Sequence, residues 1–124
     1  MMDEELVPLT IRGDVLEQLP GSAMARFYAP PSFLAEYFAL TVQERARFRQ
    51  AWQKISLALD TTGQLPPPPL VDKMTGKKKP VIYEVRWDQS SANKRATFHL
   101  EQDAQGQPVV VWRRIGDHHI YINP

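Results

Sequence analysis

Residues 95–101 read RATFHLE, and polar and apolar side chains alternate along this stretch with a period of two. One side carries the apolar residues Ala96, Phe98 and Leu100, and the other carries Arg95, Thr97, His99 and Glu101. The alternation is typical of a β-strand that buries one face and exposes the other. The stretch therefore predicts a sheet with a core on one side and an open polar face on the other.

The segments on either side continue this pattern. Residues 81–87 (VIYEVRW) alternate in the same way, with Glu84 and Arg86 on the polar side. After the turn-forming sequence QDAQGQ, residues 108–114 (PVVVWRR) predict a third strand, and residues 118–122 (HHIYI) are a candidate for a fourth. Because consecutive strands with short loops pair with their neighbours, we expect an antiparallel meander.

The N-terminal half predicts a strand followed by helices. Residues 24–30 (MARFYAP) read as a short strand, and residues 32–41 (SFLAEYFALT) have the apolar spacing of an amphipathic helix. Thr41 and Glu44 have the spacing of a capping box, which opens a second helix over residues 42–59. Two helices with almost no loop between them predict a helix hairpin.

These elements predict an α+β fold in which an N-terminal strand and a helix hairpin pack on one face of a three- to four-stranded, mainly antiparallel sheet. The chain of 124 residues, 43% of them hydrophobic, is long enough for one such domain, which we assign to residues 24–124. Residues 1–23 are then an N-terminal extension, which is either a surface strand or helix that packs on the domain or an upstream start that translation does not need. Its periodic part, DVLEQL, offers for burial Val15, Leu16 and Leu19.

The composition excludes several classes of protein. Without cysteine the chain has no disulfide, no thiolate zinc site and no cysteine nucleophile. Its longest apolar runs are only a few residues, which excludes a membrane span, and its acidic start MMDEEL is unlike a signal peptide. We therefore expect a cytoplasmic protein with no membrane partner.

Charge is distributed unevenly along the chain. Residues 1–72 contain six Lys and Arg against nine Asp and Glu, a net charge of −3. Residues 73–124 contain nine against five, a net charge of +4. The positive excess indicates an anionic partner for the second half of the chain.

The order of these segments resembles that of a known family. A strand, a helix pair and a loop precede YEVR (83–86), then RATF (95–98), and then an apolar strand that runs into RRIGDH (113–118). Over about residues 24–122 this order is similar to that of the RelE/ParE superfamily of bacterial toxins, in particular its RelE- and HigB-like ribonuclease branches. The resemblance implies a RelE-like fold, cleavage of mRNA on the ribosome without a metal ion or other cofactor, and inhibition by a cognate small antitoxin protein.

The resemblance also implies which residues form the site. The family's basic residue at the end of the first meander strand falls on Arg86, and its most regular arginine falls on Arg95. Glu84 stands where some members carry lysine. The family's C-terminal catalytic cluster falls on Arg114, Asp117, His118, His119 and Tyr121.

Cleavage of RNA by its own 2′-OH needs a base, a cation for the charge that develops on the phosphate, and an acid for the leaving 5′-oxygen. The forked guanidinium groups of Arg86 and Arg95 match phosphate oxygens. Glu84 or one of the two histidines is the candidate base, a histidine also serves as the acid, and the tyrosine positions the phosphate or stacks on a base. The candidate catalytic residues are therefore Glu84, Arg86, Arg95, Arg114, His118, His119 and Tyr121.

Further basic residues are expected to contact the RNA backbone. These are Lys77, Lys78, Lys79, Lys94 and Arg113. Structural alternatives stay open, because Arg86 and Arg95 can pair with acidic neighbours on a solvated strand face and the lysine run can be a solvated loop. No metal site is expected. Adjacent side chains leave a strand in opposite directions, so at most one of the two histidines faces the site.

Two other functions fit the sequence. ParE-like members of the same superfamily poison DNA gyrase without enzymatic activity. The other alternative is a catalytically inactive relic that binds RNA or an antitoxin. The C-terminal histidines and Tyr121 favour the ribonuclease, whereas Glu84 and the modest net charge of +1 keep the inactive relic open.

Overall fold

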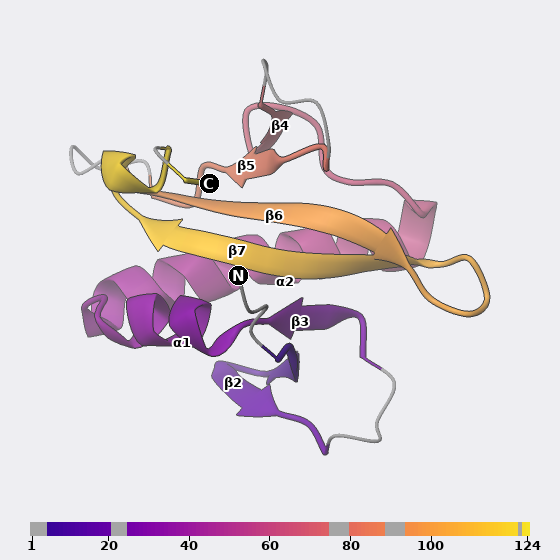
Figure 1. Cartoon of the computed structure of the whole chain (residues 1–124), viewed down its shortest axis with the longest axis horizontal. Helices are drawn as coiled ribbons and strands as arrows, with labels where there is room; N and C mark the ends of the chain where they lie inside the picture. The colour runs from indigo at the N-terminus through magenta and orange to yellow at the C-terminus, as the bar shows by residue number, and fades with distance from the viewer. Residues whose placement is uncertain (1–4, 21–24, 75–79, 89–93, 122) are drawn as a thin grey trace.

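Figure 1 shows the computed structural model of the chain, which describes residues 5–20, 25–74, 80–88, 94–121 and 123–124. Within these residues the chain forms seven strands, two α-helices and one 3-10 helix. The strands are β1 (Val7–Arg12), β2 (Val15–Gln18), β3 (Phe27–Ala29), β4 (Val71–Lys73), β5 (Tyr83–Val85), β6 (Arg95–Gln102) and β7 (Pro108–Gly116). The helices are α1 (Pro31–Phe38), α2 (Val42–Thr62) and the 3-10 helix η1 (His118–Tyr121).

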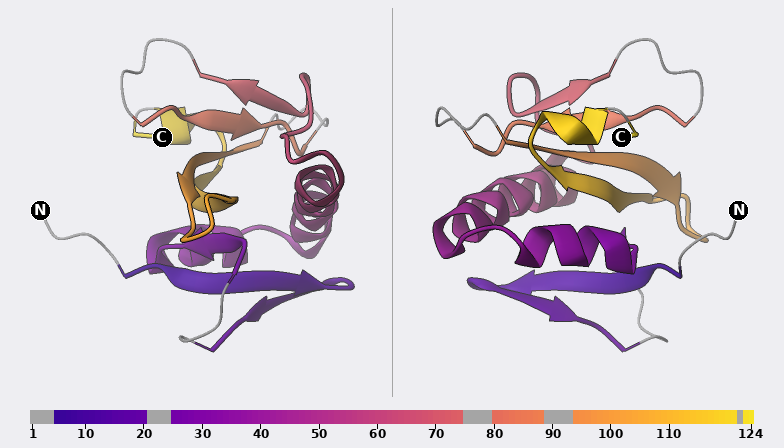
Figure 2. Two further views of the ribbon diagram at one scale, coloured as in Figure 1. Left: turned by 90° about the vertical axis from the view of Figure 1, so that its right-hand side faces the viewer. Right: turned by 60° about the vertical axis from the view of Figure 1, so that its left-hand side comes forward.

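All seven strands belong to one sheet, in the order β2-β1-β3-β7-β6-β5-β4. Neighbouring strands are antiparallel except β3 and β7, which are parallel. The predicted fold, a helix hairpin on a three- to four-stranded sheet, is therefore wrong, because the sheet is mixed and has seven strands. The additional strands lie at opposite edges, with β1 and β2 beyond β3 and β4 beyond β5 (Figure 2).

Backbone hydrogen bonding explains these additional strands. The outer edge of β3 presents N–H and C=O groups that need partners. β1 supplies them in an antiparallel register that sets Leu9 opposite Phe27. β1 in turn pairs with β2 across a turn at Gly13, whose φ of 63° lies in the left-handed region. β4 pairs with the outer edge of β5 in the same way.

Three of the four strands predicted for the meander are present. The strand predictions over residues 95–101 and 108–114 are confirmed by β6 and β7. β5 is shorter than predicted. The strand predicted over residues 118–122 is wrong, because the segment forms η1. There the N–H of Ile120 donates to the main-chain oxygen of Asp117 at 3.2 Å, a local hydrogen bond that closes the turn.

Capping residues set the ends of the helices. α1 begins at Pro31, whose missing N–H has no intrahelical partner to lose in the first turn. The predicted capping box of α2 is confirmed, since the Thr41 N–H donates to Oε1 of Glu44 (2.9 Å) and the Glu44 N–H donates to Oγ1 of Thr41 (3.1 Å). α2 ends at Gly63, whose φ of 72° turns the chain away from the helix. In the described part of the chain, neither helix has the length and apolar character that crossing a membrane requires.

Trp112 of β7 lies at the centre of an aromatic core between the sheet and both helices. Its ring is fully buried, and its centroid lies 5.7 Å from that of Phe33 in α1 and 5.0 Å from that of Phe48 in α2. Trp52 in α2 and Phe98 in β6 complete the cluster at 5.2 and 5.4 Å. Because aromatic rings bury large areas in tilted and offset contacts, the cluster fixes both helices against one face of the sheet.

β1 contributes to the same core. Leu9 is only 2% exposed and belongs to the buried cluster, and Leu16 of β2 packs against that cluster. The side-chain amide of Gln53 in α2 donates a 2.6 Å hydrogen bond to the main-chain oxygen of Gly13. Val15, by contrast, is exposed. The N-terminal hairpin is therefore held to the domain mainly through one face of β1.

Leu9→Ala is expected to lower the free energy of unfolding by about 2–5 kcal/mol, because it deletes buried methyl groups and leaves a cavity. Val15→Ala is the matched control on the exposed side of the hairpin, and it should change this free energy by less than about 0.5 kcal/mol. Urea unfolding followed by circular dichroism measures both values. Equally small effects for the two variants would mean that the domain does not depend on residues 1–23.

Candidate functional site

Four of the predicted catalytic residues gather where β5, β6 and η1 meet. The phenol of Tyr121 in η1 donates a 2.8 Å hydrogen bond to Oε2 of Glu84 in β5. Arg86 follows β5, and its Nε lies 4.0 Å from Oε1 of Glu84. Arg95 opens β6, and both arginines influence the ionisation of Tyr121. These four residues are called the Glu84–Tyr121 cluster below.

Strand pairing brings the cluster together. Glu84 lies opposite Thr97 in the register of β5 and β6, and Arg95 lies opposite Gly116 at the end of β7. Because η1 follows almost directly after β7, the chain carries Tyr121 back to Glu84. A hollow of about 390 Å³ borders the pair and is lined by Lys73, Met74, Glu84 and Tyr121. The hollow is shallow and open to solvent, so a ligand group can approach Glu84 and Tyr121 there.

Tyr121 keeps its proton in these surroundings. Burial, together with the hydrogen bond and the charge of Glu84, raises the pKa of Tyr121 to about 12, against the opposing effect of Arg95 and Arg86. At neutral pH the phenol therefore acts as a hydrogen-bond donor, and Glu84 acts as the acceptor. A carboxylate that accepts one such hydrogen bond still has lone pairs for a second proton donor. Glu84 is therefore suited to act as a general base.

The polar face is less open than the alternation predicts. Arg95 is 7% exposed and Thr97 is fully buried. The cause is the turn after β7, because η1 packs against β6 and β7 and buries Ile120. Nη1 of Arg95 donates to the main-chain oxygen of Lys94 (2.9 Å). Arg95 is therefore not on a solvated strand face, whereas the side chain of Arg86 is 48% exposed and accessible from solvent.

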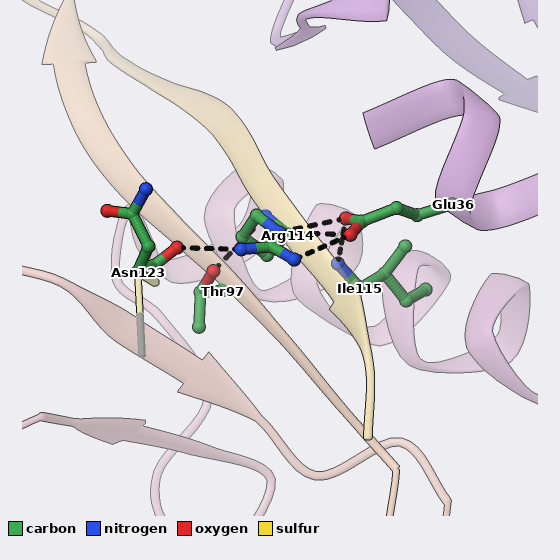
Figure 3. A network of polar contacts seen from close by, with 5 residues as sticks. All are labelled: Glu36, Thr97, Arg114, Ile115 and Asn123. Carbon is green, nitrogen blue, oxygen red and sulfur yellow. Dashed lines mark hydrogen bonds and ion pairs between the residues drawn. The ribbon is translucent and has the colours of Figure 1, made fainter. Parts of the chain in front are cut away.

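Arg114 takes part in a different contact (Figure 3). Its Nε and Nη2 donate to Oε2 of Glu36 in α1 at 3.0 and 2.8 Å. Its Nη1 donates to the main-chain oxygen of Asn123 at 3.0 Å. The hydrogen bonds to Glu36 raise the pKa of Arg114. All three guanidinium nitrogens thus have partners within the protein, so the structure gives Arg114 a structural contact and not a place in the Glu84–Tyr121 cluster.

Arg113, the neighbouring residue, joins another set of contacts. Its Nε donates to the main-chain oxygen of Pro124 (3.0 Å), and its Nη1 lies 3.0 Å from Nδ1 of His99. Because a guanidinium only donates, Nδ1 of His99 accepts, and the proton of the neutral ring lies on Nε2, 3.0 Å from Oε2 of Glu101. Burial lowers the pKa of Arg113. Arg113 is therefore a partly desolvated cation. None of its described hydrogen bonds goes to a carboxylate side chain.

The remaining predicted site residues are only partly described. Lys94 lies with its Nζ 3.7 Å from Oε2 of Glu44. The backbone of His118 and His119 forms part of η1, but their side chains lie outside the described part of the structure. The lysine run also lies outside it: Lys77, Lys78 and Lys79. Among the residues that are described, no three His, Asp or Glu side chains are grouped so as to hold a metal ion.

Sequence reasoning missed two residues near the site. Glu36 lies beside the buried Tyr37 in α1, and a carboxylate next to buried apolar residues needs a partner. That position is the signal by which Glu36 could have been found. Lys73 lines the hollow beside Glu84, but its three-residue strand follows a proline run and has no recognisable alternation.

Comparisons with known proteins identify no relative, since no protein-family model, no curated protein and no solved structure matches the chain. The resemblance to the RelE/ParE superfamily therefore stays a prediction from the motifs at residues 83–86, 95–98 and 113–118. The geometry of the Glu84–Tyr121 cluster is the independent observation that bears on the chemistry of the site.

The raised pKa of Tyr121 predicts that the protein loses stability as the pH becomes alkaline. Because its pKa is raised from 10.0 to about 12, the folded protein keeps the phenolic proton where the unfolded chain loses it. This stabilisation is complete below about pH 10 and is lost as the pH rises through about 12. Tyr121→Phe should therefore flatten the decline of the unfolding free energy, measured by urea unfolding across this range. Tyr28→Phe, in β3, is the matched control, and an identical decline in wild type and Tyr121→Phe would contradict the assignment.

Proposed function

We propose that this protein is an endoribonuclease toxin of a toxin–antitoxin pair, which cuts translated mRNA on the ribosome in the cytoplasm. The observation that supports this best is the Glu84–Tyr121 cluster, in which a 2.8 Å hydrogen bond joins a carboxylate to a phenol beside two arginines. Attack of a 2′-OH on the adjacent phosphate requires a base and cations in this kind of arrangement. The motifs that resemble the RelE/ParE superfamily favour the same reaction.

In the proposed reaction, Glu84 accepts the proton of the 2′-OH, and the 2′-oxygen attacks the adjacent phosphorus. Arg86, whose side chain is exposed, holds the phosphate oxygens that gain negative charge in the transition state, and the buried Arg95 adds its positive charge to the site. The bond from phosphorus to the 5′-oxygen breaks, and one of the two C-terminal histidines supplies the proton that this oxygen takes up. The products are a 2′,3′-cyclic phosphate and a free 5′-OH. Tyr121 keeps its own proton, because its pKa is about 12, and orients Glu84 by donating to it.

Basic residues of the second half of the chain supply the proposed RNA-binding surface. The second half of the chain has a net charge of +4, and Lys73 lines the hollow beside Glu84. We assign backbone contacts to Lys77, Lys78, Lys79, Lys94 and Arg113. Since each phosphate contact releases counterions, binding of RNA should weaken as the salt concentration rises.

Arg86→Ala should lower the rate of mRNA cleavage by about 10²–10³-fold, because it removes one charged contact to the reacting phosphate. Its side chain is 48% exposed, so the unfolding free energy should change little. Arg12→Ala is the matched control, since Arg12 is exposed and also pairs with a glutamate, Glu17, at 3.4 Å. Purified protein is incubated with translating ribosomes, cut sites are mapped by primer extension, and the ends are tested for cyclic phosphate.

The outcomes of this experiment separate the candidate functions. Cleavage within codons by wild type and Arg12→Ala, with a strong loss in Arg86→Ala, supports the ribonuclease. Equal cleavage by all three proteins would remove Arg86 from the site. A wild type that inhibits supercoiling by DNA gyrase and leaves mRNA intact would favour the gyrase-poisoning alternative. A wild type that binds ribosomes or a partner without either effect would favour the inactive relic.

The corner between α1 and α2 supports the antitoxin part of the proposal. Phe38 and Val42 are 62% and 67% exposed on either side of this corner. Arg45 and Arg49 lie in the first turns of α2. Their described hydrogen bonds go to uncharged oxygens. Arg45 donates to the main-chain oxygen of Leu40 (2.6 Å), and Arg49 donates to the phenol of Tyr37 (2.8 Å). Phe38, Val42, Arg45 and Arg49 are called the corner patch below. Exposed apolar groups beside arginines that make no ion pair within the described part of the chain suit an acidic, amphipathic segment of a partner protein.

Phe38→Asp should weaken binding of the cognate antitoxin by at least about 30-fold, because the loss of a central apolar contact typically costs about 2 kcal/mol or more. Leu57→Asp is the matched control, since Leu57 is similarly exposed on α2 but lies about 22 Å along the helix from Val42. The partner to test is a small protein encoded next to this gene, which is co-expressed with the chain and titrated by calorimetry. Equal affinities for both variants would exclude the corner patch, and no complex with wild type would contradict the toxin–antitoxin assignment.

A further inference from the structure

Glu36 of α1 binds the end of β7 through both of its carboxylate oxygens (Figure 3). Oε1 accepts hydrogen bonds from Nε of Arg114 and from the main-chain N–H of Ile115, both at 3.1 Å. Oε2 accepts from Nε and Nη2 of Arg114 at 3.0 and 2.8 Å. A bidentate pair of this kind fixes direction as well as distance. Glu36 therefore holds both the side chain and the backbone at this point of β7.

The same arginine also holds the chain on the far side of η1. Nη1 of Arg114 donates to the main-chain oxygen of Asn123 at 3.0 Å, and the Arg114 N–H donates to Oγ1 of Thr97 in β6 at 3.2 Å. Glu36 is thus linked to residues 114 and 115 before η1 and, through Arg114, to residue 123 after it. The contacts enclose the segment that carries Tyr121.

Within the enclosed segment, Ile120 adds a third attachment. Its side chain is buried, and its N–H donates to the main-chain oxygen of Asp117 at 3.2 Å. The side chain of Ile120 packs near Gly116, since a Cβ added at Gly116, whose φ is 155°, would lie 3.5 Å from Cγ2 of Ile120. Tyr121 directly follows Ile120, so its phenol reaches Glu84 from a backbone that is held before, within and after η1.

We infer that Glu36 is a positioning residue, which through Arg114 and the Ile115 N–H holds η1 where Tyr121 meets Glu84. The effect of Glu36 on cleavage rests on the proposed function, whereas its effect on the hydrogen bond between Tyr121 and Glu84 does not. Glu36 itself has no described contact with any member of the Glu84–Tyr121 cluster. An ion pair that served stability alone would leave the geometry of Tyr121 unchanged when it is removed.

The test uses the full chain with Glu36→Gln and Glu36→Ala. Glu36→Gln keeps an acceptor for the Ile115 N–H and removes the charge that holds Arg114, so it covers the case in which Glu36→Ala does not fold. Asp60→Asn is the matched control, because it breaks an ion pair of similar length, 3.0 Å to Arg26, outside η1 and the cluster. Thermal unfolding of each variant reports the general loss of stability.

The first readout is independent of enzymatic activity. In protein labelled with ¹³C-tyrosine, the resonance of Tyr121 is identified by its absence in Tyr121→Phe and is titrated at alkaline pH. In wild type and Asp60→Asn the pKa of Tyr121 should be about 12, and in the Glu36 variants it should fall toward the ordinary value of 10.0. The second readout is cleavage of mRNA, where kcat should fall by about 10²-fold with little change in KM, because displacement of a catalytic group by about 1 Å costs that much.

The two proposals fail in different ways. A fall in the pKa of Tyr121 in the Glu36 variants supports the positioning role even if wild type cleaves no RNA, a result that would contradict the proposed function alone. An unchanged pKa of Tyr121 in folded Glu36→Gln and Glu36→Ala, with an unchanged kcat, would overturn the positioning role. Equal losses of kcat in Asp60→Asn and the Glu36 variants would also overturn it, because they would reflect stability only.

Discussion

The parallel pairing of β3 with β7 is the constraint on which the rest of the structure depends. It sets Phe27 opposite Val110, and the N–H of Val110 donates to the main-chain oxygen of Arg26 at 2.8 Å. Parallel neighbours need a long connection, and here α1, α2 and the strands β4 to β6 all lie between the two strands in sequence. Because the pair lies inside the sheet, both helices can pack over Trp112 from one side. The end of β7 then meets α1, and this contact fixes where η1 and Tyr121 lie.

Local patterns in the sequence predict the local elements of this fold. The period of two in residues 95–101 and 108–114, and the capping box of Thr41 and Glu44, describe interactions between neighbours in the chain, and the structure contains all three. The size of the sheet depends instead on which distant segments meet. β4 has three residues after a proline run, and β1 and β2 lie in a segment whose pattern also fits a helix, so their pairing partners are not visible in local periodicity.

The site shows the same division. Strand pairing and the turn after β7 bring Tyr121 into a hydrogen bond with Glu84, two residues that the motifs predict for one site. The sequence does not predict that Arg113 and Arg114 have different partners, because the register of β6 and β7 shifts between Thr97 and Phe98. On β7 this shift adds one residue, so that burial passes from Trp112 to Ile115 and not to position 114. A strict period of two does not contain such an extra residue, and it gives no sign that Glu36 is the partner of Arg114.

The contact between Glu36 and Arg114 joins residues that are 78 positions apart in the chain. During synthesis α1 is made long before β7. Until β7 is made, Glu36 has no Arg114 with which to pair. Contacts of such high sequence separation form late, because a long loop must close before they can contribute. A growing chain therefore has Glu84 and both arginines of the site before it has Tyr121 in place. The complete arrangement exists only once β7 has packed against α1 and η1 has packed against β6 and β7.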